Sequence, residues 1–479
     1  MRIFITNYCM DMFTSQDEEN HDKSLARFES MLKTNKVFFF DSEEFEDIVL
    51  HYLDSGKLPM AKKALKLALD QHPTSTGLKL VQVEIWLFDD QLDAAEKLLN
   101  ELQQLEPFND EVYIQRANLH SKRDEHELAV ASLQQALVYT EDPADVHNLL
   151  GMEYLFMDEM ESAKKHFIAC LEADIEDQSA LYNVVYCYEF LDQIEGAIAF
   201  LQHYIDRQPY SEIAWHQLGR LQYQLGAYEA AVQSFELATH IDESFIGAYM
   251  ELAKALEKLK RYSEAVQYYL ETIQLGDPTS YALLRLGKCF EKSGHLAEAL
   301  SYYQRTVHED PLLDKGWMAI TNYYWKQNEP HKALMYISKA IGIDPQNIGY
   351  WRRFAQIHQA LQQYEEAEEG LRKAVELGDY NVKTWVMWAR QLMHMGEYQQ
   401  AVSVLVQAMD YFPDQARINF YLSGLYFTLN ESEKGVFYLY QGMQLRKNPR
   451  KIFEAHFPVL WASEGLQQWV ARFKSGGHA

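Results

Sequence analysis

The sequence predicts an all-α solenoid, a fold in which short helix-turn-helix units stack one after another. The first observation is a frame of thirty-four residues that fits twelve times between Ser42 and Pro449 without an insertion or a deletion. The second is the spacing inside that frame. In the copy at Glu212–Phe245, apolar residues recur every three or four positions in two sets, with Gly226 between them. Each unit therefore predicts two amphipathic helices joined by a tight turn.

Three positions of the frame explain how such units pack. The twentieth position is alanine in eleven units and Gly435 in the last, and a small side chain there lets two helices approach closely. Four positions later every unit has a large apolar residue, such as Phe235. Prolines such as Pro311 and Pro345 recur near the unit's end, where they cannot continue a helix and are expected to separate consecutive units.

The Trp-x-x-Leu-Gly sequence of Trp215–Gly219, the Ala, Phe and Ala at 231, 235 and 238, and the Asp310-Pro311 pair resemble the tetratricopeptide repeat. The resemblance covers residues 42–449, and a period of thirty-four is typical of this helical solenoid. It implies a right-handed superhelix of more than one turn. We expect the least regular packing in the units that begin at 76 and 110, where Gln82 and Arg116 replace apolar residues, and in the last unit, with its two glycines.

The frame divides the chain into three regions: a leader and N-terminal cap at 1–41, twelve repeats at 42–449, and capping helices with a tail at 450–479. We expect Gln16–Asp22 to be a solvated, disordered leader, Ser24–Leu32 to form a short helix, and the apolar Val37–Phe40 to close the first repeat, because solenoid ends must be covered. Aromatic residues from Phe453 to Phe473 predict one or two helices that close the last repeat. The alternative for that stripe is a homodimer interface.

Composition and charge exclude several classes of protein. The net charge of −26 opposes a protein whose whole surface contacts nucleic acid, because phosphates are repelled. The chain has no apolar run of the roughly eighteen residues that a membrane span needs, and its first residues lack the features of a signal peptide. Four scattered cysteines favour buried thiols in a reducing compartment. We therefore expect a cytoplasmic protein without membrane insertion.

No catalytic, metal or cofactor motif occurs in the sequence. It contains no Gly-x-Gly-x-x-Gly, Walker loop, Gly-x-Ser-x-Gly, His-Glu-x-x-His or Cys-x-x-Cys sequence, and no two histidines stand three or four residues apart. The two pieces outside the repeats are shorter than a usual domain. The sequence therefore predicts neither an enzyme, nor a metal site, nor a cofactor.

The second, fifth, ninth, twelfth and thirteenth positions of each unit fall on one side of the first helix. In the family that the chain resembles, this side lines a concave groove that contacts the ligand, and we call these positions the groove stripe. In units one to five the stripe is acidic, with a single base: Glu43, Glu46, Asp54, Glu84, Glu111, Asp145 and Glu189 against Lys122. An apolar stretch lies among them: Leu87, Phe88, Met152, Leu155, Phe156, Tyr182, Tyr186, Phe190 and Tyr223.

In units six to twelve the groove stripe is basic. Its charged residues are Arg220, Lys254, Lys258, Lys288, Lys292, Lys315, Lys326, Arg352, Lys383, Arg390 and Arg417, against Glu257 and Glu291. Two alternatives stay open, since lysines and arginines are good helix formers that are often simply solvated, and apolar stripe positions are sometimes buried against neighbouring units. The asymmetry along the stripe nevertheless favours a functional groove.

The sequence thus predicts a non-enzymatic interaction scaffold whose groove binds an extended acidic or carboxylate-bearing peptide or protein segment. The expected binding residues are Arg220, Lys254, Lys258, Lys288, Lys292, Lys315, Asn322, Trp325, Arg352, Gln356, Lys383 and Arg390. The alternative is a helical-repeat protein that binds nucleic acid, with Tyr223 or Trp325 stacking on bases. Chaperone C-termini are not expected ligands, because only Arg352 and Gln356 approach the residue pattern that binds them in the family.

Overall fold

A computed structural model describes residues 15–34, 38–276, 279–446 and 448–474 of the chain. These ranges contain twenty-eight α-helices and no strand, which confirms the all-α class. The chain forms two compact units, Met1–Asp242 and Glu243–Ala479, which we call the first and the second unit; the thirty-four-residue segments are called repeats from here on. The boundary falls just after the second helix of the sixth repeat, so Arg220 belongs to the first unit and the other predicted binding residues belong to the second.

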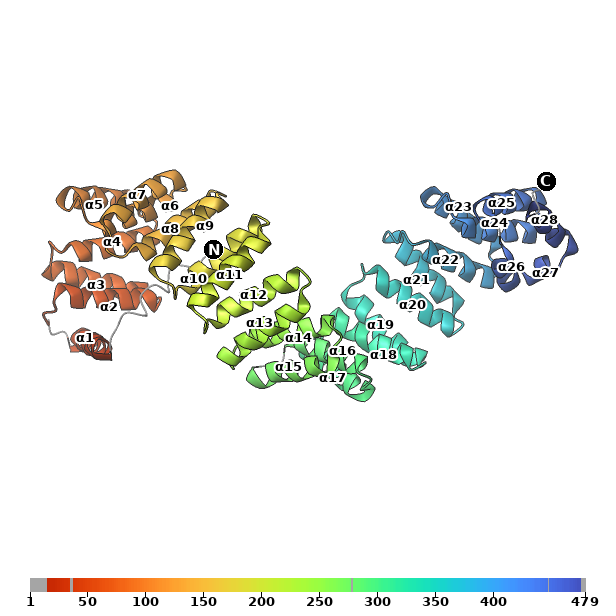
Figure 1. Cartoon of the computed structure of the whole chain (residues 1–479), viewed down its shortest axis with the longest axis horizontal. Coiled ribbons are helices and arrows are strands. Elements are labelled where there is room, and N and C mark those ends of the chain that lie inside the picture. The colour runs from red at the N-terminus through yellow and green to blue at the C-terminus, as the bar shows by residue number, and fades with distance from the viewer. Residues whose placement is uncertain (1–14, 35–37, 277–278, 447, 475–479) are drawn as a thin grey trace. The chain divides into compact units, whose positions relative to one another are not determined.

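The first unit begins with α1 (Ser15–Thr34), which is followed by six helix pairs (Figure 1). In each pair the two helices pack on each other, and from the second pair onward each first helix also packs on the helix before it. The pairs are α2 (Ser42–Asp54) with α3 (Leu58–Gln71), α4 (Thr76–Phe88) with α5 (Leu92–Leu105), α6 (Asp110–Lys122) with α7 (His126–Tyr139), α8 (Pro143–Phe156) with α9 (Met160–Ala173), α10 (Gln178–Phe190) with α11 (Ile194–Arg207), and α12 (Glu212–Gln224) with α13 (Tyr228–Ile241).

The second unit contains six further pairs and three C-terminal helices. The pairs are α14 (Ile246–Lys258) with α15 (Tyr262–Leu275), α16 (Ser280–Lys292) with α17 (Leu296–Glu309), α18 (Asp314–Lys326) with α19 (Pro330–Ile343), α20 (Ile348–Ala360) with α21 (Tyr364–Glu376), α22 (Val382–His394) with α23 (Tyr398–Tyr411), and α24 (Ala416–Thr428) with α25 (Ser432–Leu445). The terminal helices are α26 (Arg450–His456), α27 (Pro458–Trp461) and α28 (Glu464–Lys474). This succession of packed pairs confirms the helical solenoid in each unit.

The helices start where the frame of thirty-four places them. All first helices begin one period apart except α8, which begins one residue early at Pro143, and all second helices keep the period. Many first helices begin after a residue whose side chain accepts a backbone N–H, as Ser211 does from Ala214 at 3.2 Å. The helices α4 to α7 of the repeats at 76 and 110 have the same lengths as their counterparts, and the expectation that packing is less regular there stays a prediction.

The twentieth and twenty-fourth positions form the contact inside each pair. Every alanine at the twentieth position is fully buried, as is Phe235 at the twenty-fourth position of the sixth repeat. Gly435 takes the alanine's place in the last repeat, where an added Cβ would lie 2.8 Å from the ring of Phe427. An added Cβ at Gly442 would similarly lie 2.6 Å from Phe420. The two glycines therefore accommodate large neighbours and do not loosen the last repeat, contrary to our expectation.

A left-handed residue forms the turn inside every pair. The fifteenth position has a positive φ in all twelve repeats, from 55° at Asp192 to 90° at Gly294. In the sixth repeat Ala227 then donates its N–H to the carbonyl of Gln222 at 2.9 Å, which closes the end of the first helix. Most repeats have Gly, Asp or Asn at this position, the residues that adopt this conformation most readily, whereas Lys260 and Gln362 are exceptions.

The N-terminal end of the first unit is covered by α1. Fully buried Phe28 of α1 packs against Phe40 and Phe45, with ring centroids 6.1 and 6.2 Å apart. Ser24 also donates a hydrogen bond to Glu44 at 2.8 Å. The helix begins at Ser15, so Gln16–Asp22 is helical and not the disordered leader that we expected. Val37 lies outside the described residues.

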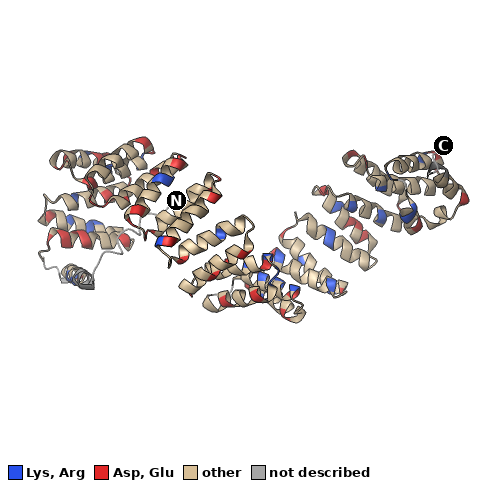
Figure 2. Cartoon of the chain, in the orientation of Figure 1, with Lys and Arg blue, Asp and Glu red and all other residues tan. Residues whose placement is uncertain are grey.

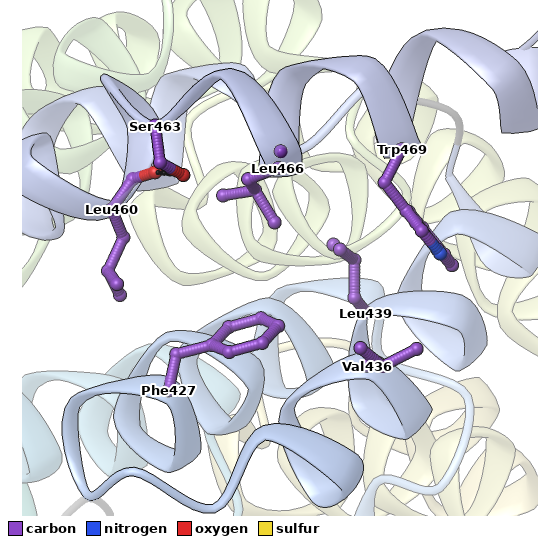
Figure 3. Close-up of a pocket in the computed structure, with 8 residues that line it drawn as sticks. Phe427, Val436, Leu439, Leu460, Ser463, Leu466 and Trp469 are labelled. Atoms are coloured by element: carbon purple, nitrogen blue, oxygen red, sulfur yellow. Dashed lines mark hydrogen bonds between the residues drawn. The ribbon is translucent and has the colours of Figure 1, made fainter.

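The C-terminal aromatic residues cover the end of the second unit. Phe453, Phe457 and Val470 are buried in one core with α24 and α25. Between these helices and α27–α28 lies an apolar cavity of about 200 Å³, lined by Phe427, Val436, Leu439, Leu460, Ser463, Gly465, Leu466 and Trp469 (Figure 3). The side chain of Phe473 and residues 475–479 lie outside the described part of the chain. The three-region division and a homodimer through this end stay predictions.

Candidate functional site

The groove stripe lies on the first helix of each pair, where it is only partly open. In the first unit, α4 contacts α2 and α6 directly, so successive first helices form one layer. The fifth position belongs to the core in several repeats, because Leu284, Val386 and Phe420 are at most 3% exposed. In these repeats the open surface of the stripe comes from the other four positions, whereas Tyr182 and Arg352 are fifth-position residues that stay partly exposed.

Carboxylates of the acidic part of the stripe lie close enough to repel one another. Burial and the nearby carboxylates of Glu111 and Asp54 raise the pKa of Glu84 to about 7. Burial and neighbouring aspartates also raise the pKa of Asp145, and burial raises the pKa of Glu111. Glu46 is likewise raised in pKa, mainly by burial. These four side chains make no ion pair among the described residues, unlike Glu189 of the same stripe, which pairs with Arg220.

Arg220 is the basic residue that we placed at the beginning of the cationic stripe, yet it is neutralised inside the first unit. Its guanidinium donates two hydrogen bonds to the carboxylate of Glu189, at 2.8 and 2.6 Å, and a third to Gln217 at 2.9 Å. Glu189 is itself a stripe residue of the preceding repeat. A bidentate pair of this kind fixes both side chains, so Arg220 and Glu189 act as a bridge between repeats.

Three basic stripe residues of the second unit are also paired. Lys254 lies 2.7 Å from Glu251 on its own helix, and its ammonium also lies over the ring of Tyr281. Arg352 approaches the buried carboxylate of Asp379 at 3.5 Å. Lys326 is bonded to Glu291 of the preceding repeat. Their charges are largely balanced before any ligand arrives.

The remaining basic stripe residues of the second unit make no ion pair within the described chain. They are Lys258, Lys288, Lys292, Lys315, Lys383, Arg390 and Arg417. Burial together with the charges of Arg285 and Lys315 lowers the pKa of Lys288. In the ribbon of Figure 2 acidic residues recur over α2–α6 and basic residues over α20–α24. The set of basic stripe residues without an ion pair is smaller than the sequence alone suggests.

Basic groups from two repeats and the C-terminal region come together at α22, α24 and α26. The ring of His456 lies 5.1 Å from that of fully buried Tyr421. Burial and the nearby charges of Arg390, His394 and Arg417 lower the pKa of His456 to about 4. The Nε of Arg390 and the hydroxyl of Tyr421 are buried without a hydrogen bond of good geometry. Arg390, His394, Arg417 and His456, which we call the terminal basic cluster, make no ion pair among the described residues.

The three uncharged or aromatic residues that we predicted have different surroundings. The Oδ1 of Asn322 is buried without a hydrogen-bond partner in the described residues. Trp325 is half-buried, with the guanidinium of Arg353 5.5 Å from its ring. Gln356 accepts a hydrogen bond from Arg353 at 3.0 Å. Trp325 and Gln356 are therefore engaged by a neighbouring arginine, which sequence spacing did not reveal.

Several functional candidates escaped the sequence analysis. Arg285 and Arg353 stand at the sixth position of their repeats, outside the stripe, yet both reach stripe residues. His394 stands at a stripe position, and only the structure shows that it lies near Arg390, Arg417 and His456. His456 lies outside the repeats, so no periodic signal identifies it.

The apolar stretch of the stripe in the first unit is divided between core and surface. Leu87 is buried, and Met152 and Leu155 pack against a core cluster. In contrast, Phe88, Phe156, Tyr182, Tyr186 and Phe190 are between 42 and 69% exposed. The alternative that these positions are simply buried therefore holds for the aliphatic residues and not for the five aromatic ones.

The described residues offer little to support chemistry. Cys170, Cys187 and Cys289 are fully buried, and burial raises the pKa of Cys187 to about 11 and that of Cys289 to about 12. No three His, Cys, Asp or Glu side chains of the described ranges are grouped so as to hold a metal ion. No helix in these ranges is long and apolar enough to cross a membrane.

Two sequence profiles, both described as tetratricopeptide repeat, match the chain. One matches residues 144–174, 213–245, 315–347 and 349–377, and the other matches 250–313 and 386–450. Together these segments make up more than half of the sequence. The chain belongs to the tetratricopeptide repeat family. Tetratricopeptide repeats are in general non-catalytic, and this tetratricopeptide protein is a protein–protein interaction scaffold.

Solved structures of tetratricopeptide proteins are also similar to the chain. YrrB, described as a TPR protein with an unusual peptide-binding site, is 23% identical and has a TM-score of 0.35; the match covers 38% of this chain and 95% of YrrB. MamA is 17% identical over 35% of this chain and 97% of its own, with a TM-score of 0.33. A chain of the APC/C hetero-tetramer Cut9–Hcn1 is 12% identical and has a TM-score of 0.36; the match covers 85% of this chain and 94% of that one. A search of curated protein sequences finds no match.

Proposed function

We propose that this tetratricopeptide protein is a cytoplasmic, non-enzymatic scaffold whose second unit binds an extended protein segment rich in Asp, Glu or other anionic groups. The observation that carries the proposal is the set of seven basic stripe residues without an ion pair: Lys258, Lys288, Lys292, Lys315, Lys383, Arg390 and Arg417. In a chain of net charge −26 these side chains gather positive charge on one series of helices, where Glu257 and Glu291 offset part of the charge of Lys288.

The pKa values of two groups support an anionic ligand. Neighbouring positive charges contribute to lowering the pKa of Lys288 and that of His456, so positive groups at both places repel one another. An anion placed among these positive groups reduces their mutual repulsion. It is therefore bound more tightly than an anion beside a single isolated cation. Carboxylates or phosphates from an extended segment satisfy this requirement at successive repeats, since each exposed contact contributes only about 0.2–1 kcal/mol.

The terminal basic cluster provides the most specific part of this surface. Arg390, His394 and Arg417 lie near enough to His456 for their charges to lower its pKa. An anion placed beside this cluster is attracted by more than one cation, so it gains more than it does at an isolated lysine. We expect the segment to place a carboxylate or phosphate there.

Fluorescence anisotropy with a labelled acidic 12-residue peptide of Glu and Ala tests the proposal. The variant Lys292→Glu, Lys315→Glu, Lys383→Glu changes three exposed stripe residues and should reduce affinity at least 10-fold. The matched control Lys332→Glu, Lys339→Glu, Lys434→Glu makes the same charge change at exposed positions of second helices and should bind almost as the wild type does. Circular dichroism should show equal helix content in all three proteins.

Ionic strength and the pKa of His456 give two further measurements. Binding should weaken steeply with added salt, because the Debye length falls from about 10 Å at 0.1 M to about 3 Å at 1 M. The NMR titration of His456 should move upward from its value of about 4 when the acidic peptide is bound. Equal affinity in the stripe variant and the control contradicts the proposal. Tighter binding of a single-stranded oligonucleotide than of the peptide favours the nucleic-acid alternative.

A further inference from the structure

Helix α10 of the first unit has two apolar faces. Leu181, Val184, Val185 and Cys187 are buried in the core, as expected for an amphipathic helix. The stripe side of the same helix carries Tyr182, Tyr186 and Phe190, which are 42, 48 and 59% exposed. These three residues are spaced by four, so they lie on one side over consecutive turns. An exposed row of aromatic rings on a helix that already has a buried face indicates an interaction surface.

The same surface continues on other first helices of the unit. Phe88 is the last residue of α4 and Phe156 the last residue of α8, and they are 69 and 44% exposed. Both occupy the thirteenth position of their repeats, as Phe190 does. We call the five residues Phe88, Phe156, Tyr182, Tyr186 and Phe190 the aromatic row.

The aromatic rings of the two units differ in whether a cation covers them. In the second unit the stripe rings of Tyr281 and Trp325 have the chain's own Lys254 and Arg353 over them, at 5.3 and 5.5 Å. In the described part of the first unit, no lysine or arginine of the chain lies over a ring of the aromatic row. The ring of His126 stacks on Phe156 at 5.3 Å, whereas the other four rings of the row have no such cover among the described residues and present π faces that attract cations.

Most of the charges around the row are negative, and Lys122 is the single basic stripe residue of the first five repeats. Asp145 at the start of α8 is close enough to Asp142, Asp174 and Asp177 for their charges to raise its pKa. Burial and neighbouring carboxylates likewise raise the pKa of Glu84 on α4 and that of Glu111 on α6. The basic stripe residue nearest in sequence to α10, Arg220, is already bound by Glu189. A ligand for this surface must therefore bring positive charge.

We propose that the first unit has a second binding surface, formed by the aromatic row and the carboxylates of Glu84, Glu111 and Asp145, which takes an extended segment of another protein with Lys or Arg side chains among apolar ones. The apolar side chains cover the rings, and the cations lie over ring faces and beside the carboxylates. This surface is opposite in charge to the stripe of the second unit and does not depend on it.

A random 12-residue peptide library displayed on phage, selected on the full chain, tests the proposal. During selection, an excess of the soluble variant Tyr182→Ser, Tyr186→Ser, Phe190→Ser removes peptides that bind elsewhere. The enriched peptides should have a net positive charge together with aromatic or aliphatic residues. The best of them, made synthetically, should bind the wild type and lose at least 10-fold in affinity with the serine variant.

The chain offers a control of the same composition. Phe108, Tyr210 and Tyr380 are 72, 82 and 69% exposed, and all three stand at the thirty-third position of a repeat, away from the stripe. Their replacement by serine should leave peptide affinity within about twofold. The variant Lys292→Glu, Lys315→Glu, Lys383→Glu should also leave it unchanged, which separates this surface from the one proposed for the second unit.

A second variant tests the electrostatic half with the rings intact. Glu84→Gln with Asp145→Asn removes two carboxylates and should lower the affinity for the basic peptide about fivefold or more. Enrichment of acidic peptides, failure to enrich any peptide, or equal binding to the serine variant overturns the proposal. Self-association of the wild type that the serine variant loses also overturns it, because the row is then an interface between copies of this chain.

Discussion

The two units present different chemistry at one structurally equivalent position. The thirteenth position is the last residue of the first helix, two residues before the left-handed turn. It is Phe88, Phe156 and Phe190 in three repeats of the first unit, and Lys258, Lys292 and Lys326 in the first three of the second. All six side chains are exposed. Because packing makes no demand there, the side chain is free to be set by what the surface binds.

The twentieth position shows the opposite behaviour. Alanine occurs there in both units and is fully buried in every repeat that has it. A larger side chain would separate the two helices of a pair, so the position allows no difference between units. The comparison teaches that this solenoid keeps its interior constant and varies its first-helix surface, and that the variation changes at the boundary between the units.

The largest effects should come from removing the end caps, which differ in structure between the units. Phe28→Ala empties the contact of α1 with Phe40 and Phe45, and Phe453→Ala empties the contact of α26 with Phe457. Each should cost about 3–5 kcal/mol. Since stability in a solenoid is local, hydrogen exchange should rise only in the unit that carries the change. The control Phe39→Ala, at a side chain 65% exposed, should have little effect. Equal loss of protection in both units would show a single cooperative fold.

The next effect concerns the acidic stripe of the first unit. Glu84 has a pKa of about 7 in the folded chain, above its ordinary value of 4.5. The folded state therefore binds this proton more tightly than the unfolded state does. The protonated carboxyl contributes its full stabilisation below about pH 4.5, and this stabilisation is lost as the pH rises through 7. Glu84→Gln should stabilise the first unit by about 1–3 kcal/mol at pH 8 and change little at pH 4. Thermal melting across this range, with exposed Glu43→Gln as control, measures the difference; a gain that does not depend on pH contradicts it.

A third experiment removes the contrast at the thirteenth position. Phe88→Lys, Phe156→Lys and Phe190→Lys give the first unit the lysines of the second. Affinity for the basic peptide should fall. Affinity for an acidic peptide should rise about threefold or more, since the variant adds three exposed ionic contacts of about 0.2–1 kcal/mol each. Fluorescence anisotropy with both peptides gives the two changes. Unchanged preferences would show that this position does not contact ligands.

The smallest effect lies in the turns. Lys260 in the second unit has a φ of 62°, where Gly226 stands at the equivalent place in the first. A residue with a Cβ is roughly 1 kcal/mol less stable in this conformation than glycine. Glycine offsets part of that difference, because it loses more conformational entropy when the chain folds. Lys260→Gly should therefore stabilise its repeat by about 0.5 kcal/mol, and the reverse change Gly226→Lys should destabilise its repeat by about the same amount. Denaturant unfolding measures both, and a loss of stability with Lys260→Gly would be inconsistent with strain at this residue.

Much of the fold could be predicted from the sequence because its causes are local. Helix starts follow from apolar spacing and from capping residues such as Ser211, and the close packing of each pair follows from alanine at the twentieth position. The left-handed turn also had a sequence signal, since Gly, Asp or Asn recurs at the fifteenth position. The same local periodicity predicted which half of the stripe is acidic and which is basic.

Other features depend on residues that meet only when repeats stack. Arg220 is held by Glu189, thirty-one residues earlier in the chain, and Lys326 by Glu291, so neither charge is open although both stand at basic stripe positions. His456 reaches the stripe from outside the repeats. A period of thirty-four determines where each side chain leaves its helix. Which carboxylate, ring or core that side chain then meets is decided by the stacking of neighbouring helices, and this decides which charges remain for a partner.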